Sequence, residues 1–208
     1  MEVDFSSTVM RYFGYLVKDY DFRVEKIDIS DRAPLTEGRI DFVCPTTFVV
    51  VSSEQSTAGA VVGRIQDDRY RYFLNPLTIR KYHALTESDK GVLYSLNPRD
   101  DAKAKIINRA TRITPLKNPS ESTLDYIVTQ LSNYSKWLRQ YAEPFLRGDF
   151  AQWLEIYEFS VLSSRAAHIR AGKSEYVRTT SADVDNRISI FQNRFDYLER
   201  LRAEHRSR

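Results

Sequence analysis

The sequence predicts an α+β fold, with an antiparallel sheet early in the chain and a helical C-terminal half that covers it. Two patterns carry this prediction. Between residues 22 and 74, apolar and polar residues alternate in short runs separated by turn residues, which is typical of a β-meander. After residue 75, apolar residues recur every three or four positions, which is typical of helices with one buried face.

The chain has the size and composition of a globular domain. It has 208 residues, of which 42% are hydrophobic and 28% are charged, and both values are ordinary for globular proteins. We therefore expect a single domain over residues 1–208. Its expected parts are a helix and meander in 1–75, a helical layer in 76–170 and a helical extension in 182–205.

An N-terminal helix precedes the meander. Phe5, Val9 and Phe13 recur at helical spacing, which predicts a helix over residues 5–20. Ser6 or Ser7 is the expected N-cap. About five strands follow, at 22–29, 39–44, 48–53, 60–66 and 69–74. One face of such a sheet needs a cover, which the later helices can supply.

The second half of the chain is predicted to be helical. The expected helices are a short one at 76–85, a weak pattern at 100–112, a long amphipathic one over 122–145, one that begins near 149, and a last one over 182–204. The stretch 86–99 has no clear pattern. Pro144 predicts a break because proline lacks a backbone N–H, and Gly148 can end the helix by adopting a left-handed conformation.

Motifs that carry catalysis are missing from the sequence. The seven glycines are scattered, so no loop is built to hold a phosphate. His83, His168 and His205 lie far apart, and Cys44 is the single cysteine, which excludes a multi-cysteine zinc site. We therefore expect no enzyme activity, no catalytic residues, no metal and no cofactor.

The cysteine count and the hydropathy pattern also indicate a compartment. A chain with a single cysteine has no internal disulfide framework, which fits a reducing cytoplasm. No apolar run is long enough to cross a membrane. We expect a cytoplasmic protein without a membrane partner.

Three aromatic residues are the candidates for contact with another protein. Trp137 lies at the edge of the apolar stripe of the helix over 122–145, and Trp153 and Tyr157 belong to the next helix. Large aromatic side chains dominate binding hot spots. Packing in the core is the alternative, especially for Trp153 and Tyr157.

The last helix offers a second kind of contact. From Val184 to Leu198 its apolar residues step alternately by four and three, which is the heptad spacing of a helix seam. This pattern predicts a homodimer, or a helix that packs back on its own domain.

A basic and aromatic stretch at 69–83 supports a different function. It holds Arg69, Arg71, Arg80 and Lys81 among tyrosines, and cations beside stacking rings are used to bind single-stranded nucleic acid. A half-buried strand with its arginines in water is the alternative. The net charge of +3 is too small to choose between them.

Two stretches resemble a known class of proteins. Leu16 to Phe22 shows an L-x-x-x-Y-x-F pattern, and Leu138 to Phe150 reads LRQYAEPFLRGDF. Together they resemble small uncharacterised bacterial proteins grouped with the immunity proteins of toxin systems, over residues 5–160. The resemblance implies a bacterial, cytoplasmic protein that neutralises a toxin by covering its surface, and it assigns no catalytic residue. Many relatives have glycine at the position of Asp21.

Overall fold

The computed structural model describes residues 4–30, 37–54, 57–66, 72–94, 123–163 and 181–207. The chain divides into two compact units, Met1–Arg80 with Thr114–Phe150, and Lys81–Ile113 with Ala151–Arg208. The predicted α+β class is confirmed, since a helical N-terminus is followed by an antiparallel sheet and then by helices. The single domain over residues 1–208 stays a prediction.

The N-terminal helix forms in two pieces, α1 (Phe5–Phe13) and α2 (Tyr15–Asp19), joined at Gly14. Its N-cap is Asp4 instead of the predicted Ser6 or Ser7. One carboxylate oxygen of Asp4 accepts the backbone N–H of Ser7 at 2.7 Å, and the other accepts the Ser7 hydroxyl at 2.8 Å. These bonds hold the pKa of Asp4 below its usual value. A carboxylate offers a separate oxygen to each of these bonds, and aspartate is among the preferred N-cap residues.

The sheet has four strands in the order β1-β2-β3-β4, all antiparallel to their neighbours. They are β1 (Arg23–Ile29), β2 (Gly38–Val43), β3 (Thr47–Glu54) and β4 (Thr57–Arg64). The prediction of about five strands was therefore wrong. Within the expected strand at 69–74, residues 69–71 lie outside the described residues, and Leu74 forms only an isolated bridge to Val62.

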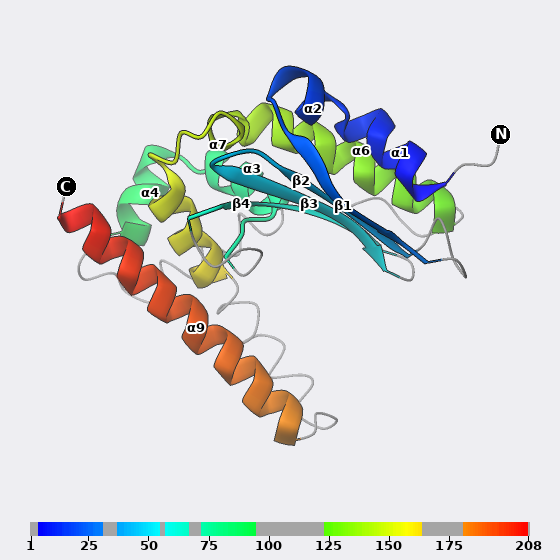
Figure 1. The fold of residues 1–208 in the computed structure, drawn as a ribbon. Coiled ribbons are helices and arrows are strands. Elements are labelled where there is room, and N and C mark those ends of the chain that lie inside the picture. The colour runs from blue at the N-terminus through cyan, green and yellow to red at the C-terminus, as the bar shows by residue number, and fades with distance from the viewer. Residues whose placement is uncertain are drawn as a thin grey trace. The chain divides into compact units, whose positions relative to one another are not determined.

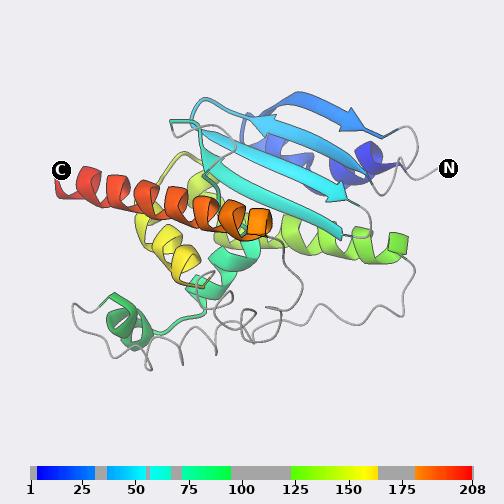
Figure 2. The same ribbon diagram turned by 90° about the horizontal axis from the view of Figure 1, so that it is seen from below.

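Two helices of the first unit cover one face of the sheet. Figures 1 and 2 show α1 and α6 (Thr123–Tyr141) side by side on this face, and α6 lies against β4. The sheet residues beneath the helices are almost fully buried: Ile40, Phe42, Val49, Val51, Ala60 and Val62. The helices after Phe150 belong to the second unit, so a cover formed by the whole C-terminal half stays a prediction.

The predicted break near Pro144 is present. Helix α6 ends at Tyr141, and Pro144 lies in the first turn of the short α7 (Glu143–Leu146). Gly148 follows with a φ of 80°, a conformation that glycine adopts without strain. Thr47 of β3 donates its hydroxyl to the Phe145 carbonyl at 2.8 Å, which ties α7 to the sheet.

The second unit is helical over its described residues. It contains α4 (Glu87–Tyr94), a helical segment over 153–163 and α9 (Ser181–Arg206), while α3 (Pro76–His83) begins in the first unit. Leu198 of α9 is buried, and Arg202 pairs with Glu158 of the 153–163 segment. This part of α9 packs on its own unit. The weak helix expected at 100–112 lies outside the described residues. No helix in the described part of the chain is long and apolar enough to cross a membrane.

Candidate protein-binding surface

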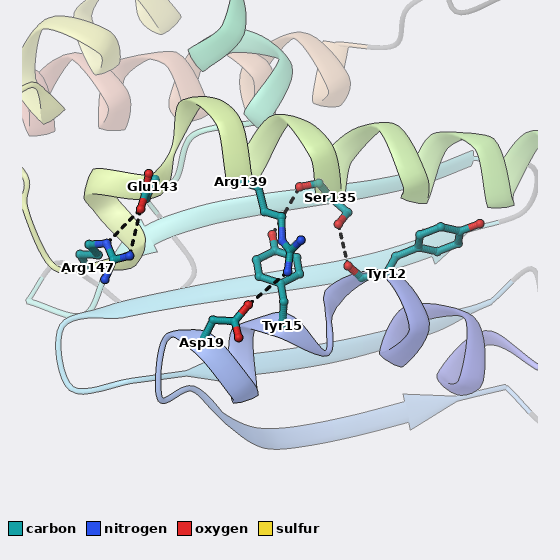
Figure 3. A network of polar contacts seen from close by, with 7 residues as sticks. All are labelled: Tyr12, Tyr15, Asp19, Ser135, Arg139, Glu143 and Arg147. Carbon is teal, nitrogen blue, oxygen red and sulfur yellow. Dashed lines mark hydrogen bonds and ion pairs between the residues drawn. The ribbon is translucent and has the colours of Figure 1, made fainter.

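The first unit places two exposed arginines against a buried tyrosine and a partly buried one where α2 meets the end of α6. We call this set the arginine–tyrosine surface, and Figure 3 shows most of it. Its residues are Tyr15, Asp19, Tyr20, Arg139, Glu143 and Arg147. Local spacing explains each half, since residues four positions apart in a helix lie on one side of it. The contact between α1 and α6 then joins two halves that are about 120 residues apart in the sequence.

Arg139 stacks on Tyr15 and pairs with Asp19. Its guanidinium carbon lies 4.0 Å from the centre of the Tyr15 ring, and Nη2 donates to Asp19 Oδ2 at 3.2 Å. The side chain of Arg139 remains 53% exposed. An exposed ion pair contributes little stability, but stacking and pairing together restrict the guanidinium to one orientation. The group is therefore accessible and already ordered.

Arg147 repeats this arrangement one step further along the surface. Its guanidinium lies 5.1 Å from the Tyr20 ring centre, and both Nε and Nη2 donate to Glu143 Oε1 at 3.0 Å. The Arg147 side chain is 62% exposed. The rings of Tyr15 and Tyr20 meet edge to face at 6.0 Å. Two ordered arginines thus lie on a pair of touching tyrosines.

Bonds beneath this surface fasten α1 and α2 to α6. The Ser135 hydroxyl donates to the Tyr12 carbonyl at 2.6 Å, and the Tyr15 hydroxyl makes a longer bond of 3.4 Å to the Ser135 carbonyl. Burial raises the pKa of Tyr15 well above its usual range, so this hydroxyl stays protonated and continues to donate. The surface is therefore held on two helices that are bonded to each other.

The three aromatic residues predicted for partner contact are buried. Trp137 is 8% exposed, with Arg80 stacked at 5.0 Å from its ring and Tyr134 against its edge. In the second unit, Trp153 Nε1 donates to the Tyr197 hydroxyl at 3.1 Å, and Tyr157 stacks on Trp153. All three side chains pack inside the fold, and their contact with a partner stays a prediction.

Sequence reasoning missed the arginine–tyrosine surface, although part of its signal is local. Arg139, Glu143 and Arg147 recur every four positions, and such spacing predicts charged neighbours along one side of a helix. Nothing near them in the sequence indicates Tyr15 or Tyr20. Arg139 and Arg147 stack on those two rings, and this stacking distinguishes the surface from an ordinary charged helix end.

Of the four residues predicted for nucleic-acid binding, the structure describes Arg80 and Lys81. Arg69 and Arg71 lie outside the described residues. Arg80 stacks on Trp137 in the first unit, and Lys81 begins the second unit. The nucleic-acid site stays a prediction without a described geometry.

The described residues contain no cluster of three or more His, Cys, Asp or Glu side chains that could hold a metal ion. Asp41, an acidic residue buried within the sheet, instead accepts two bonds from Arg39, at 2.7 and 3.2 Å. The thiol of Cys44, which is partly buried, lies 3.8 Å from the Thr46 hydroxyl.

Comparisons with known proteins found no matching family model, no matching curated protein and no matching solved structure. The resemblance to immunity proteins therefore stays a prediction that depends on the two sequence stretches alone.

Proposed function

We propose that this chain is a non-enzymatic protein-binding module that docks through the arginine–tyrosine surface. The observation that carries the proposal is the pair of exposed arginines, each stacked on a tyrosine and paired with a carboxylate. Arginine and tyrosine are among the residues that contribute most to binding hot spots. Because these arginines are already ordered, binding loses less side-chain entropy than it would with mobile ones.

The partner we propose is another protein with carboxylates on its contact surface. Each guanidinium has five N–H donors in a planar fork, and its intramolecular bonds use only some of them. The remaining N–H groups can donate to a carboxylate of the partner.

The biological role we propose is that of an immunity-like protein in a bacterial cytoplasm, which neutralises a toxin by covering its surface. The resemblance of Leu138 to Phe150 supports this role, since that stretch supplies Arg139, Glu143 and Arg147. The chain is mildly basic, whereas inhibitors of nucleic-acid-cleaving toxins are often acidic, so the proposed toxin is not a nuclease.

The alternative is a nucleic-acid-binding accessory protein that uses Arg69, Arg71, Arg80 and Lys81. It predicts an association that weakens steeply with salt, because released counterions drive such binding. Affinity that is insensitive to salt would exclude it.

The test compares two double variants of the tagged full chain in cells of its source organism. R139A/R147A removes both stacked arginines. K18A/K136A is the matched control, because it removes two positive charges from exposed positions of α2 and α6 outside the surface. Cross-linking followed by mass spectrometry then measures the amount of each co-purified protein.

We expect a protein that is recovered in equal amounts with the wild type and K18A/K136A, and at least about tenfold less with R139A/R147A. A tenfold loss corresponds to about 1.4 kcal/mol, and fewer than about a third of interface residues cost more than about 1 kcal/mol when truncated. Equal recovery with all three chains, each folded by circular dichroism, would contradict the proposed surface.

A further inference from the structure

Strand β1 has an open outer edge. It is the first strand of the sheet, and within the described residues no strand pairs with it on the side away from β2. Most of its residues are exposed, and Ile27 is 54% exposed, the highest value among the large hydrophobic residues of the described chain. An open edge presents backbone N–H and C=O groups that another strand can bond.

The register of the sheet shows which side chains share a face of β1. Ile27 lies opposite Ile40, which is buried beneath the helices. Lys26 and Asp28 lie opposite Asp41 and Arg39, on the other face. There Lys26 Nζ donates to Asp28 Oδ2 of the same strand at 3.1 Å, with both side chains more than half exposed. Side chains alternate between faces along a strand, so β1 presents an apolar residue on its helix-covered face and two opposite charges on the other.

These charges make β1 complementary to itself in one antiparallel register. If two copies pair about a two-fold axis at Ile27, each Lys26 faces the Asp28 of the other copy, and the two Ile27 side chains meet. A register centred on Lys26 would instead place two lysines opposite each other, and one centred on Asp28 would place two aspartates there. Like charges directly opposite are destabilising, whereas opposite charges stabilise the pair.

Two further exposed apolar residues lie on α1 and α2, the helices that contact β1. Met10 and Val17 are 39% and 38% exposed, and seven residues apart they share one side of the helix. Each lies about 140° to 160° around the helix from Tyr12 and Tyr15, the residues that bond α6. This side therefore lies away from α6, and both α1 and α2 contact β1.

We propose that two copies of this chain associate through β1, with Lys26 of each copy facing Asp28 of the other, so that their sheets become one. The bulge between Val24 and Lys26 and the charges of β1 are features that keep edges from pairing with unrelated strands. Here the order of Lys26 and Asp28 favours pairing with an identical copy in the register centred on Ile27 and disfavours the registers that place like charges opposite each other. This surface differs both from the arginine–tyrosine surface and from the predicted seam at Val184 to Leu198.

Charge reversals test the register without the need to know any other partner. In K26D and in D28K, both symmetric contacts between identical copies become repulsive. When the two variants are mixed, the acidic pair on the K26D chain faces the basic pair on the D28K chain. We therefore expect a dimer for the wild type, monomers for each variant alone, and a dimer again for the equimolar mixture, measured by sedimentation velocity at about 50 to 200 μM.

The mixture also separates association from folding, because unfolded variants would not pair again on mixing. K136D is the matched control, since Lys136 is an exposed lysine of α6, and we expect it to remain dimeric. A wild type that is monomeric throughout this range would overturn the proposal. A dimer that both variants retain would also overturn it and would point instead to the α9 seam. Two folded monomeric variants that fail to associate when mixed would overturn it as well.

Discussion

The two edges of the sheet are protected in different ways. At β4, Leu74 closes the edge by exchanging two backbone bonds with Val62, at 2.9 and 2.8 Å. Helix α6 contributes Gln130, whose side-chain oxygen accepts the Ala58 N–H at 2.6 Å. At β1, charged side chains and a bulge take the place of a cover. One sheet therefore uses closure at one edge and charge at the other, and both are known protections against unwanted pairing.

The side chains of the two edge strands also differ in size. Strand β4 carries a glycine where neighbours approach closely, since a Cβ added at Gly63 would lie 2.2 Å from the Phe48 ring and 2.8 Å from the Tyr72 carbonyl oxygen. Strand β1 carries long side chains that reach water. We therefore expect substitutions at the closed edge to change the free energy of unfolding, and substitutions at the open edge to change association.

The largest effect is expected from Leu74→Ala. Leu74 is fully buried, so the truncation removes apolar contacts and leaves a cavity, at a cost of about 2 to 5 kcal/mol. Urea unfolding followed by circular dichroism measures the loss. A cost below about 1 kcal/mol would contradict the burial of the Leu74 side chain in the core.

A smaller but sharper effect is expected from Gly63→Ala. The added methyl group meets the Phe48 ring and the Tyr72 backbone, and overpacking of this kind costs about 1 to 3 kcal/mol. Gly59→Ala is the matched control in the same strand, because nothing lies within 4 Å of a Cβ added there. The same urea measurement should find Gly59→Ala within about 0.5 kcal/mol of the wild type. Equal costs at both positions would contradict close packing at Gly63.

The smallest effect on folding is expected from Ile27→Thr at the open edge. The side chain is more than half exposed and threonine keeps the β-branched shape that strands favour, so the change should stay within about 0.5 kcal/mol. Unfolding is followed at a protein concentration low enough to keep the chain monomeric. A loss above about 1 kcal/mol would contradict the exposure of the Ile27 side chain.

Much of the local structure could be predicted because its signals are local. The alternation of β1 to β4 and the helical spacing of α1 and α6 need only a period of two or 3.6 residues. One local signal was overlooked. Helix α4 begins with a capping box in which Asp89 N–H donates to the Thr86 hydroxyl at 3.1 Å and Thr86 N–H donates to Asp89 at 3.2 Å, and the T-x-x-D spacing of this motif is visible in the sequence.

The number of strands and the exposure of individual side chains could not be predicted in the same way. Leu74 has the apolar character of a strand residue, yet within the described residues it forms only an isolated bridge, to Val62. Trp137 lies at the edge of its apolar stripe, and a single helix would leave it accessible. Arg80, 57 positions earlier, stacks on its ring.

The sequence by itself determined which faces of its helices and strands are apolar, and therefore the α+β class, because those periods are properties of adjacent residues. Only the tertiary structure decided which edge of the sheet is closed and which side chains form a surface. Arg139 meets Tyr15 because α1 and α6 pack against each other on the sheet. Such contacts depend on distance in space, and spacing along the chain does not encode that distance.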